Sequence, residues 1–515
     1  MRLFEILILA GLSVTLLGGL LPRARRPTWL RYLGWLTPGL ILLHFAVEHY
    51  RWQMVPAYVL AAVAALWSLR KPALAAHAPR PSWVRRAGRV LAVVCALLVV
   101  GLSGVLAVGF PVFVAPLPTG PLGIGTTRLF FVDSSRVDSF APNANTPREL
   151  LATVWYPADV PSGAARDPFW PTDADAAQGA GLPPFMLSHV PLVAGNSSPD
   201  APLAKAEARY PVILYSHGYG ASNWTNVPQM EELASHGFIV VSLGHTYDAS
   251  RLTFPDGRVV IGNAGTRVPP MKPDDARMIG ARTAEMKAEK DPAAVRRAWK
   301  EVMALQNKAG WVVPGSGQVW IADTRYLIDQ LSAIDAGTVR GVVGNADRFT
   351  GHMALDRLGL AGMSFGGSTT GSVCAIDPRC KAGVNLDGSQ FGDVIDHPVQ
   401  VPFLYFTSAS NNEFPVYFGS PADLYEVHVK RSTHGNFTDL TLIMPLFTWL
   451  ARFGVPFLGE IGTSEMERVM SAYSLAFFQK YLQGTTQPLL DATGASAAHP
   501  DVVFTAWPAG RAVVP

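Results

Sequence analysis

One stretch of the sequence, Gly362-Met363-Ser364-Phe365-Gly366-Gly367, has the residue types and spacing of a nucleophilic turn. An apolar run at 358–361 precedes it, and small residues at 368–373 follow it, as expected for a strand that turns into a helix. Glycines two positions to either side of the serine leave room for such a sharp turn because they have no Cβ atom. Ser364 is therefore predicted to be the nucleophile of an acyl-transfer reaction.

A serine nucleophile needs a histidine as general base and a carboxylate that orients this histidine. With this type of turn, the three residues follow one another in the order Ser, acid, His. His434 is the predicted base because it follows the late strand 425–429 on a loop rich in small residues. Two acids qualify. Asp387 ends the strand 382–386, and Glu413 follows the next strand, so the residues alone leave these two equally good.

The tetrahedral intermediate of acyl transfer needs two N–H donors for its oxyanion. The buried-type strand 210–215 leads into Ser216-His217-Gly218-Tyr219-Gly220, a His-Gly turn of the kind that supplies one such donor. Tyr219 is predicted to provide this backbone N–H, and Phe365, the residue after the nucleophile, the second. A glycine-rich turn without a catalytic role is the alternative.

The elements around these motifs alternate between strands and helices, which predicts parallel strand pairing. Residues 119–515 are therefore predicted to form an α/β-hydrolase fold, in which helices flank a mostly parallel sheet, with a hairpin at its start. The segment 161–209 is predicted to be a surface excursion or a lid, and 257–309 a helical flank. The remaining expected strands and helices are 128–132, 150–156, 231–236, 238–243, 319–334 and 402–407.

The first 118 of the 515 residues contain most of the apolar excess of the chain, which is 49% hydrophobic and 16% charged. Apolar runs occur at 3–21, 33–47, 54–69 and 90–114. They predict a membrane anchor of about four transmembrane helices over residues 1–118, with three or two spans as alternatives because the middle runs are short. A cleaved signal peptide fits less well, since the positive charge follows the first run.

Basic residues predict the orientation of this anchor by the positive-inside rule. They gather after the first run and between the third and fourth, at Arg23, Arg25, Arg26, Arg31, Arg70, Lys71, Arg80, Arg85, Arg86 and Arg89. Both loops are expected to be cytoplasmic, which places the N-terminus and the chain after about Val114 outside. The protein is thus predicted to be integral to a bacterial-type inner or plasma membrane, with an extracytoplasmic catalytic domain. A net charge of +3 gives no sign of nucleic-acid binding.

The three cysteines form no Cys-x-x-Cys pair and no cluster with histidine, so no metal site or cofactor is expected. Cys95 lies within an apolar run and is predicted to be a packing residue. Cys374 and Cys380 are close enough in sequence to form a disulfide in an oxidising compartment. Two free thiols are an equally good alternative.

Together, the motifs resemble the plasma-type platelet-activating factor acetylhydrolase family of serine lipases with an α/β-hydrolase fold. The resemblance spans about residues 120–482 and rests on Gly120-Pro121-Leu122-Gly123-Ile124-Gly125-Thr126-Thr127, Val154-Trp155-Tyr156-Pro157-Ala158, Ser216-His217-Gly218-Tyr219-Gly220, Ser364-Phe365-Gly366-Gly367, Leu386-Asp387 and His434-Gly435-Asn436-Phe437-Thr438-Asp439. It implies that Asp387, and not Glu413, is the acid. It also implies a calcium-independent enzyme that releases short or oxidised acyl chains from phospholipids. The N-terminal apolar runs depart from the family.

The expected function is therefore a serine carboxylic-ester hydrolase acting on phospholipids or related lipid esters. The main alternative is a general carboxylesterase, similar to dienelactone hydrolases, acting on non-lipid esters. Two other classes are a non-catalytic membrane sensor and a transporter with an accessory domain. The short spans lack paired intramembrane charges, which argues against transport.

The predicted topology is testable with alkaline phosphatase fused after Pro118. The reporter is expected to be active, since it folds only outside the cytoplasm and the preceding basic loops are expected inside. A fusion within residues 72–79 is the control and is expected to be inactive. The opposite pattern would reverse the orientation.

Overall fold

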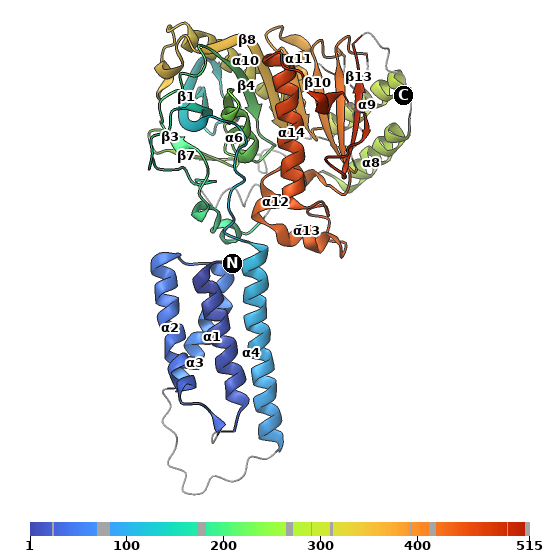
Figure 1. Ribbon diagram of the computed structural model, residues 1–515. Coiled ribbons are helices and arrows are strands. Elements are labelled where there is room, and N and C mark those ends of the chain that lie inside the picture. Colours follow the sequence, from blue (N-terminus) through green and yellow to red (C-terminus); the bar gives the residue numbers. More distant parts are fainter. Residues whose placement is uncertain are drawn as a thin grey trace.

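A computed structural model of the protein describes most of the chain. The described residues are 1–22, 25–68, 83–171, 182–263, 271–289, 291–309, 313–391, 394, 396–410, 419–491 and 493–509. A helical bundle at the N-terminal end leads into a larger α/β part (Figure 1). The predicted boundary near residue 118 falls in the extended segment that joins them.

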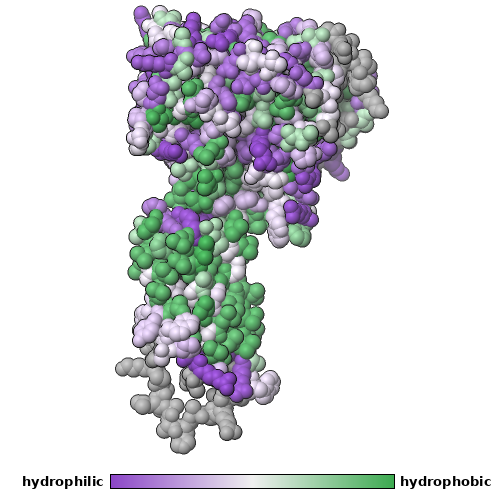
Figure 2. Space-filling model, viewed as in Figure 1, coloured by the Kyte–Doolittle hydropathy of each residue, from purple (hydrophilic) through white to green (hydrophobic). Residues whose placement is uncertain are grey.

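In the described part of the chain, four helices form the bundle: α1 (Leu3–Leu20), α2 (Trp29–Val47), α3 (Val55–Ser68) and α4 (Trp83–Gly109). Among the described residues, Leu3–Leu20 and Arg86–Gly109 are long and apolar enough to cross a bilayer, whereas Tyr32–Val47 and Trp52–Leu66 are shorter. The outer surface of the bundle is largely apolar (Figure 2), with leucines such as Leu42 and Leu98 more than two-thirds exposed. Apolar residues on all sides are typical of helices that contact lipid.

Cys95 does not pack inside the bundle as predicted, because it is exposed on α4. The apolar run around it predicts burial only if protein surrounds the helix, and here much of α4 faces outward. Both ends of the bundle chain, the N-terminus and the end of α4, lie beside the α/β part (Figure 1). The chain therefore enters and leaves the bundle at the same end, and the side of a membrane on which this end lies stays a prediction.

The α/β part is built on an eleven-stranded sheet in the order β12-β13-β11-β10-β9-β8-β4-β5-β2-β1-β3. Six neighbouring strands of this order, β11, β10, β9, β8, β4 and β5, pair in parallel. The strands β1, β2 and β13 add antiparallel pairs at the two sides. The strands are β1 (Gly123–Val137), β2 (Pro147–Ala158), β3 (Ser198–Pro199), β4 (Tyr210–Ser216), β5 (Ile239–Gly244), β8 (Met353–Met363), β9 (Ala382–Leu386), β10 (Phe403–Ser408), β11 (Leu424–Val429), β12 (Gly494–Ala495) and β13 (Val502–Trp507). The mostly parallel sheet and the initial hairpin confirm the predicted fold.

The central strands are buried on both faces, which explains their nearly continuous apolar sequences. In β4, Ile213 and Tyr215 pack into one hydrophobic cluster, and Val212 and Leu214 into the other. This alternation follows from the two-residue period of a strand. Figure 1 shows helices on both faces of the sheet. They include α6 (Val227–Ser235), α8 (Pro273–Ala288), α9 (Pro292–Lys308), α10 (Val313–Asp335), α11 (Phe365–Ile376) and α14 (Thr463–Leu482).

The predicted peripheral segments fold as follows. The flank 257–309 contains α8 and α9, but it begins with the strand β7 (Val259–Ile261), which forms a small hairpin with β6 (Arg251–Thr253). The segment 161–209 is not only a surface excursion, because Phe169 and Trp170 are buried in the core. An excursion that supplies two large aromatic side chains to the core is fixed to it by their burial.

Cys374 and Cys380 form a disulfide between α11 and the start of β9. Of the two alternatives left open by the sequence, the structure contains the bridged form.

Aromatic side chains join the bundle to the α/β part. Trp52 lies against Phe185, with ring centroids 5.1 Å apart, and donates a hydrogen bond from Nε1 to the Met186 carbonyl at 3.3 Å. Phe110, just after α4, contacts Phe447 of α13 (Pro445–Ala451). The helix α13 thus rests on the end of α4 (Figure 1).

Candidate active site

Ser364 lies in a strained turn between β8 and α11, as the glycine spacing predicts. Its backbone has φ 54° and ψ −119°, a combination that residues other than glycine rarely adopt. A Cβ atom on Gly366 would meet the backbone of Ser216, and one on Gly362 would meet the carbonyl of Gly366. The Ser364 N–H donates to the Leu386 carbonyl at 2.9 Å, which ties the turn to β9.

His434 lies between Ser364 and Asp387. Its Nε2 is 2.8 Å from Ser364 Oγ, and its Nδ1 is 2.7 Å from Asp387 Oδ2. These distances fit an Nδ1–H that donates to the carboxylate and an Nε2 that accepts from the hydroxyl. The His434 side chain is 54% exposed, whereas Asp387 is 2% exposed, so only the imidazole and the hydroxyl are accessible to a ligand.

Of the two candidate acids, Asp387 is within the described residues and contacts His434. The second oxygen of Asp387 accepts the Ser408 N–H at 2.7 Å, so both oxygens of this carboxylate are held. Asp387 has φ 54°, and a Cβ on the following Gly388 would meet the carbonyl of Ser364. Glu413 lies outside the described residues. Of the described acids, Asp387 is the one that contacts His434.

Both predicted oxyanion residues lie next to Ser364. Tyr219 lines a pocket of about 210 Å³ together with Ser364 and His434. Phe365 is the first residue of α11, and its ring centroid is 5.2 Å from that of Tyr219. The first N–H groups of a helix have no partner within the helix and carry its positive dipole end. An anionic oxygen beside Ser364 would therefore meet a favourable field.

A family model described as "Platelet-activating factor acetylhydrolase, isoform II" matches residues 151–256 and 325–488, just over half of the chain. The chain belongs to the platelet-activating factor acetylhydrolase family. The family and its named relatives establish that the protein is an ester hydrolase.

The relatives of this family member are distant in sequence but cover long segments. The platelet-activating factor acetylhydrolase of Cavia porcellus is 24% identical over 386 residues, covering 71% of this chain and 78% of that protein. A probable 1-alkyl-2-acetylglycerophosphocholine esterase of Arthroderma benhamiae is 22% identical, covering 80% and 98%. Among solved structures, a ferulic acid esterase from Streptomyces cinnamoneus matches with TM-score 0.52 and 26% identity, covering 75% and 98%.

Two further pocket residues, Trp170 and Asn226, were not predicted from the sequence to belong to the site. Trp170 lines the pocket and donates from Nε1 to Asp439 Oδ2 at 2.9 Å. Asn226, in a left-handed conformation with φ 54°, donates to the Phe437 carbonyl at 2.9 Å. The only local signal for Trp170 is an aromatic pair within a polar segment. Asn226 joins the oxyanion loop to the His434 loop, a contact across 211 residues that local patterns do not encode.

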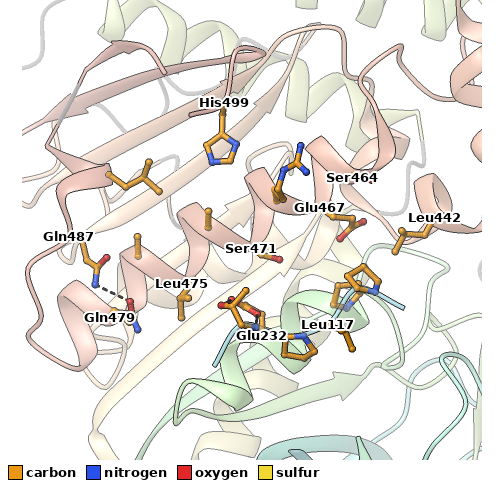
Figure 3. Close-up of a pocket in the computed structure, with 18 of the residues that line it drawn as sticks. Leu117, Glu232, Leu442, Ser464, Glu467, Ser471, Leu475, Gln479, Gln487 and His499 are labelled. Carbon is orange, nitrogen blue, oxygen red and sulfur yellow. Dashed lines mark hydrogen bonds between the residues drawn. The ribbon is translucent and has the colours of Figure 1, made fainter. Parts of the chain in front are cut away.

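A second and larger cavity, of about 600 Å³, lies between the chain after α4 and the helix α14. In Figure 3, Glu467, Ser471, Leu475 and Gln479 follow one another along α14, and Leu117 lies on another wall of the cavity. Among the described residues that line it, no serine is hydrogen-bonded to a histidine. The smaller pocket is therefore the candidate active site despite its size.

Two buried carboxyls lie behind the candidate active site. Burial raises the pKa of Asp439 to about 7. Burial, together with the nearby Asp439, raises the pKa of Glu467 to about 8. The Glu467 carboxyl accepts a hydrogen bond from Gln229 Nε2 at 2.7 Å. Between the pocket and the larger cavity lies α12 (Leu440–Ile443), with Leu440 at the first and Leu442 at the second.

In the described part of the chain, one group of side chains could hold a metal ion, Glu5, His44 and Glu48 of the bundle. Its acids already have partners. Glu5 pairs with Arg51 at 2.6 Å, and Glu48 with His44 at 3.0 Å. None of the three residues lines the pocket of Ser364, and their contacts join the helices of the bundle.

The buried carboxyls predict a pH dependence of stability. A carboxyl whose pKa is raised on folding binds its proton more tightly in the folded state, so its contribution is present below the unfolded pKa and lost as pH rises through the folded pKa. For Glu467 this window extends from about pH 4.5 to about pH 8. The variant E467Q carries no such charge, so its melting temperature is expected to rise relative to wild type between pH 5 and pH 8.

Thermal unfolding of the full-length protein in detergent at both pH values measures this effect. The control is E301Q, which removes an exposed carboxylate of α9. Its difference from wild type is expected to stay nearly constant. An equal shift in both variants would contradict the role of burial.

Proposed function

We propose that the protein is a membrane-anchored serine esterase that hydrolyses short or oxidised acyl esters of phospholipids or related lipids. The proposed catalytic residues are Ser364, His434 and Asp387. The single observation that carries this proposal is the position of the His434 imidazole, 2.8 Å from the serine hydroxyl and 2.7 Å from the carboxylate.

In the proposed mechanism, Ser364 Oγ attacks the ester carbonyl while His434 Nε2 accepts the hydroxyl proton. Asp387 holds the imidazole and stabilises its cation. The backbone N–H groups of Tyr219 and Phe365 bind the oxyanion. The C–O bond to the alcohol then breaks, and His434 returns its proton to the leaving oxygen. Water attacks the acyl-enzyme with the same histidine as base, which releases the carboxylic acid and restores the serine.

Pocket size supports a short acyl group. The volume of about 210 Å³ is below the roughly 300 to 1,000 Å³ of sites that enclose drug-sized ligands. Trp170 and Leu440 add apolar surface next to Ser364. A short acyl chain fits such a volume, whereas a long chain would need space beyond it.

Proximity to the bundle supports a lipid substrate. The loop of His434 continues into α12 and α13, and α13 packs on the end of α4. If α1 and α4 span a membrane, as their length and apolarity allow, the pocket lies close to the bilayer surface. The Cys374–Cys380 disulfide supports the extracytoplasmic side, where disulfides persist.

A second candidate is a general carboxylesterase acting on non-lipid esters. The similarity to a protein named ferulic acid esterase favours it, since that protein shares the fold over 75% of this chain. Both candidates use the same three residues and differ only in the alcohol and acyl groups that the pocket accepts.

The catalytic residues are testable by substitution. We expect S364A to lower kcat for p-nitrophenyl butyrate by roughly 10⁴-fold or more, because the nucleophile is lost. We expect D387N to lower it by about 10⁴-fold through loss of the correct histidine tautomer. S332A, which removes a hydroxyl of α10 away from the pocket, is the control and should retain wild-type turnover. Wild-type turnover by S364A would exclude the proposed mechanism.

The substrate class is testable with a panel of esters presented to the full-length protein. Phosphatidylcholines with acetyl, hexanoyl and palmitoyl groups at sn-2 are compared with p-nitrophenyl butyrate and methyl ferulate. We expect kcat/KM to fall at least tenfold from the acetyl to the palmitoyl lipid, because the pocket is small. Faster hydrolysis of methyl ferulate than of every phospholipid would favour the non-lipid alternative.

A further inference from the structure

Four buried side chains from distant parts of the chain connect to the turn that contains Tyr219. Arg148 of β2 donates to Asp323 of α10 through Nη2 at 2.6 Å and Nε at 3.1 Å. From Asp323, the series of contacts continues through two histidines, His245 and His217. Asp323 Oδ2 is 3.0 Å from Nδ1 of His245, and the His245 backbone N–H donates to His217 Nε2 at 3.2 Å. His217 Nδ1 is 2.7 Å from the Gly218 carbonyl. All four side chains are at most 2% exposed.

The hydrogen bonds define one tautomer of His217. A backbone N–H can only donate, so Nε2 of His217 must accept, and the ring proton lies on Nδ1. Nδ1–H then donates to the Gly218 carbonyl. Burial, with His245 nearby, lowers the pKa of His217 to about 3, so the ring is neutral. Burial also lowers the pKa of His245. A neutral ring with a single tautomer holds one defined position.

The acceptor of this bond, the Gly218 carbonyl, belongs to the same peptide unit as the Tyr219 N–H. The described chain has no cis peptide bond, and in a planar trans peptide the C=O and N–H point in opposite directions. Fixing the carbonyl therefore fixes the direction of the N–H. The carbonyl also accepts the Ala221 N–H at 2.9 Å. On the opposite side, a Cβ on Gly218 would lie 2.9 Å from Met363 Sδ, so this peptide packs closely against the elbow.

The same region contains a second Ser-His-Asp series, but it is not a second nucleophilic site. Ser216 Oγ is 3.3 Å from Nε2 of His245, whose Nδ1 faces Asp323. His245 and Asp323 are fully buried, Ser216 is 5% exposed, and Trp320 stacks on the imidazole with centroids 3.7 Å apart. No ester can reach this serine. The arrangement instead holds His245 in place from three sides.

We propose that Arg148, Asp323, His245 and His217 act as positioning residues that orient the Tyr219 N–H toward the oxyanion. This inference rests on the proposed role of Tyr219 in the oxyanion hole. It assigns to buried residues outside the pocket a role in transition-state binding, since a donor aimed at the developing charge stabilises the transition state more than the substrate.

Replacement of His217 tests this role. H217L removes the bond to the Gly218 carbonyl, whereas H217N keeps an N–H donor near the position of Nδ1. Each variant is titrated with a fluorophosphonate, and kcat is expressed per reactive serine. We expect H217L to lower kcat by about 10- to 100-fold, less than the roughly 10²- to 10³-fold cost of deleting a donor. We expect KM to change less than about twofold. H217N should lie within about threefold of wild type.

A trifluoromethyl ketone that forms a tetrahedral adduct with the serine provides the second readout. Its inhibition constant should rise in H217L by the same factor as kcat falls, because both depend on the oxyanion. A residue that only stabilises the fold would change the melting temperature and the number of reactive serines, but neither kcat per reactive serine nor the affinity of the ketone.

Matched variants of two buried carboxylates extend the test. Asp323 and Asp377 each pair with arginine and are almost fully buried, but Asp377 pairs with Arg379 and Arg325 away from the turn. D323N should lower kcat and ketone affinity together, while D377N should lower only stability. If H217L fails to fold, the comparison of D323N with D377N decides the question.

Wild-type kcat and ketone affinity in both H217L and D323N would overturn the positioning role. This failure is separable from failure of the proposed function. If S364A is inactive while H217L and D323N are unaffected, only the positioning role is rejected. If S364A is active, the proposed nucleophile itself is wrong.

Discussion

The strained backbone of Ser364 is the constraint on which the arrangement of the site depends. A left-handed φ of this kind costs of order 1 to 3 kcal/mol and persists only where surrounding structure enforces it. Here the enforcement comes from both neighbouring strands. The carbonyl end of β4 fills the space beside Gly366, and the turn at Gly388 after β9 lies against the Ser364 carbonyl. The serine hydroxyl is consequently presented at the edge of the sheet where the loops of β4, β9 and β11 meet.

The buried carboxyl groups around this turn are of two kinds, which differ in whether a cation pairs with them. Burial alone would raise the pKa of Asp323, but Arg148 and His245 bring it below the ordinary value. A charge that is paired and hydrogen-bonded on both sides can be buried at low cost and holds its partners in fixed positions. Asp439 and Glu467 instead accept hydrogen bonds from the neutral side chains of Trp170, Gln229 and Thr441, and no cation of the described residues pairs with either carboxyl. Their pKa values rise instead, and they tend to remain protonated near neutral pH.

The bundle and the α/β part are joined through α13, which follows the loop of His434 in the chain. Gly109 at the end of α4 lies so close to Leu446 of α13 that a Cβ would be 2.7 Å from the leucine Cβ. Directly after α4, the Phe110 carbonyl accepts hydrogen bonds from Gln53 and Arg51, which closes the end of the bundle. Together with the aromatic contacts of Trp52 and Phe110, these interactions give the pocket a defined orientation relative to the bundle axis. An enzyme that takes its substrate from a bilayer would benefit from that orientation.

The sequence by itself was sufficient to predict the fold, and its local patterns also pointed to Ser364, His434 and the turn at Tyr219, which the structure places side by side. Glycine spacing around a sharp turn and the two-residue period of buried strands can be read within a few positions. The choice of Asp387 over Glu413 needed the family resemblance, since both acids follow strands of the same type. The interpretation of Cys95 failed because an apolar run does not tell whether protein or lipid surrounds it.

Only the tertiary structure decided which distant residues support the site. Arg148 and Asp323 are 175 positions apart, and they meet because the order of the sheet and the path of α10 bring them under the turn after β4. Trp170 reaches the pocket from a segment whose composition indicated a surface loop. Such contacts depend on how the strands are ordered and how the helices pack across them. A local pattern of residue types does not contain that information, because the same pattern is compatible with many strand orders.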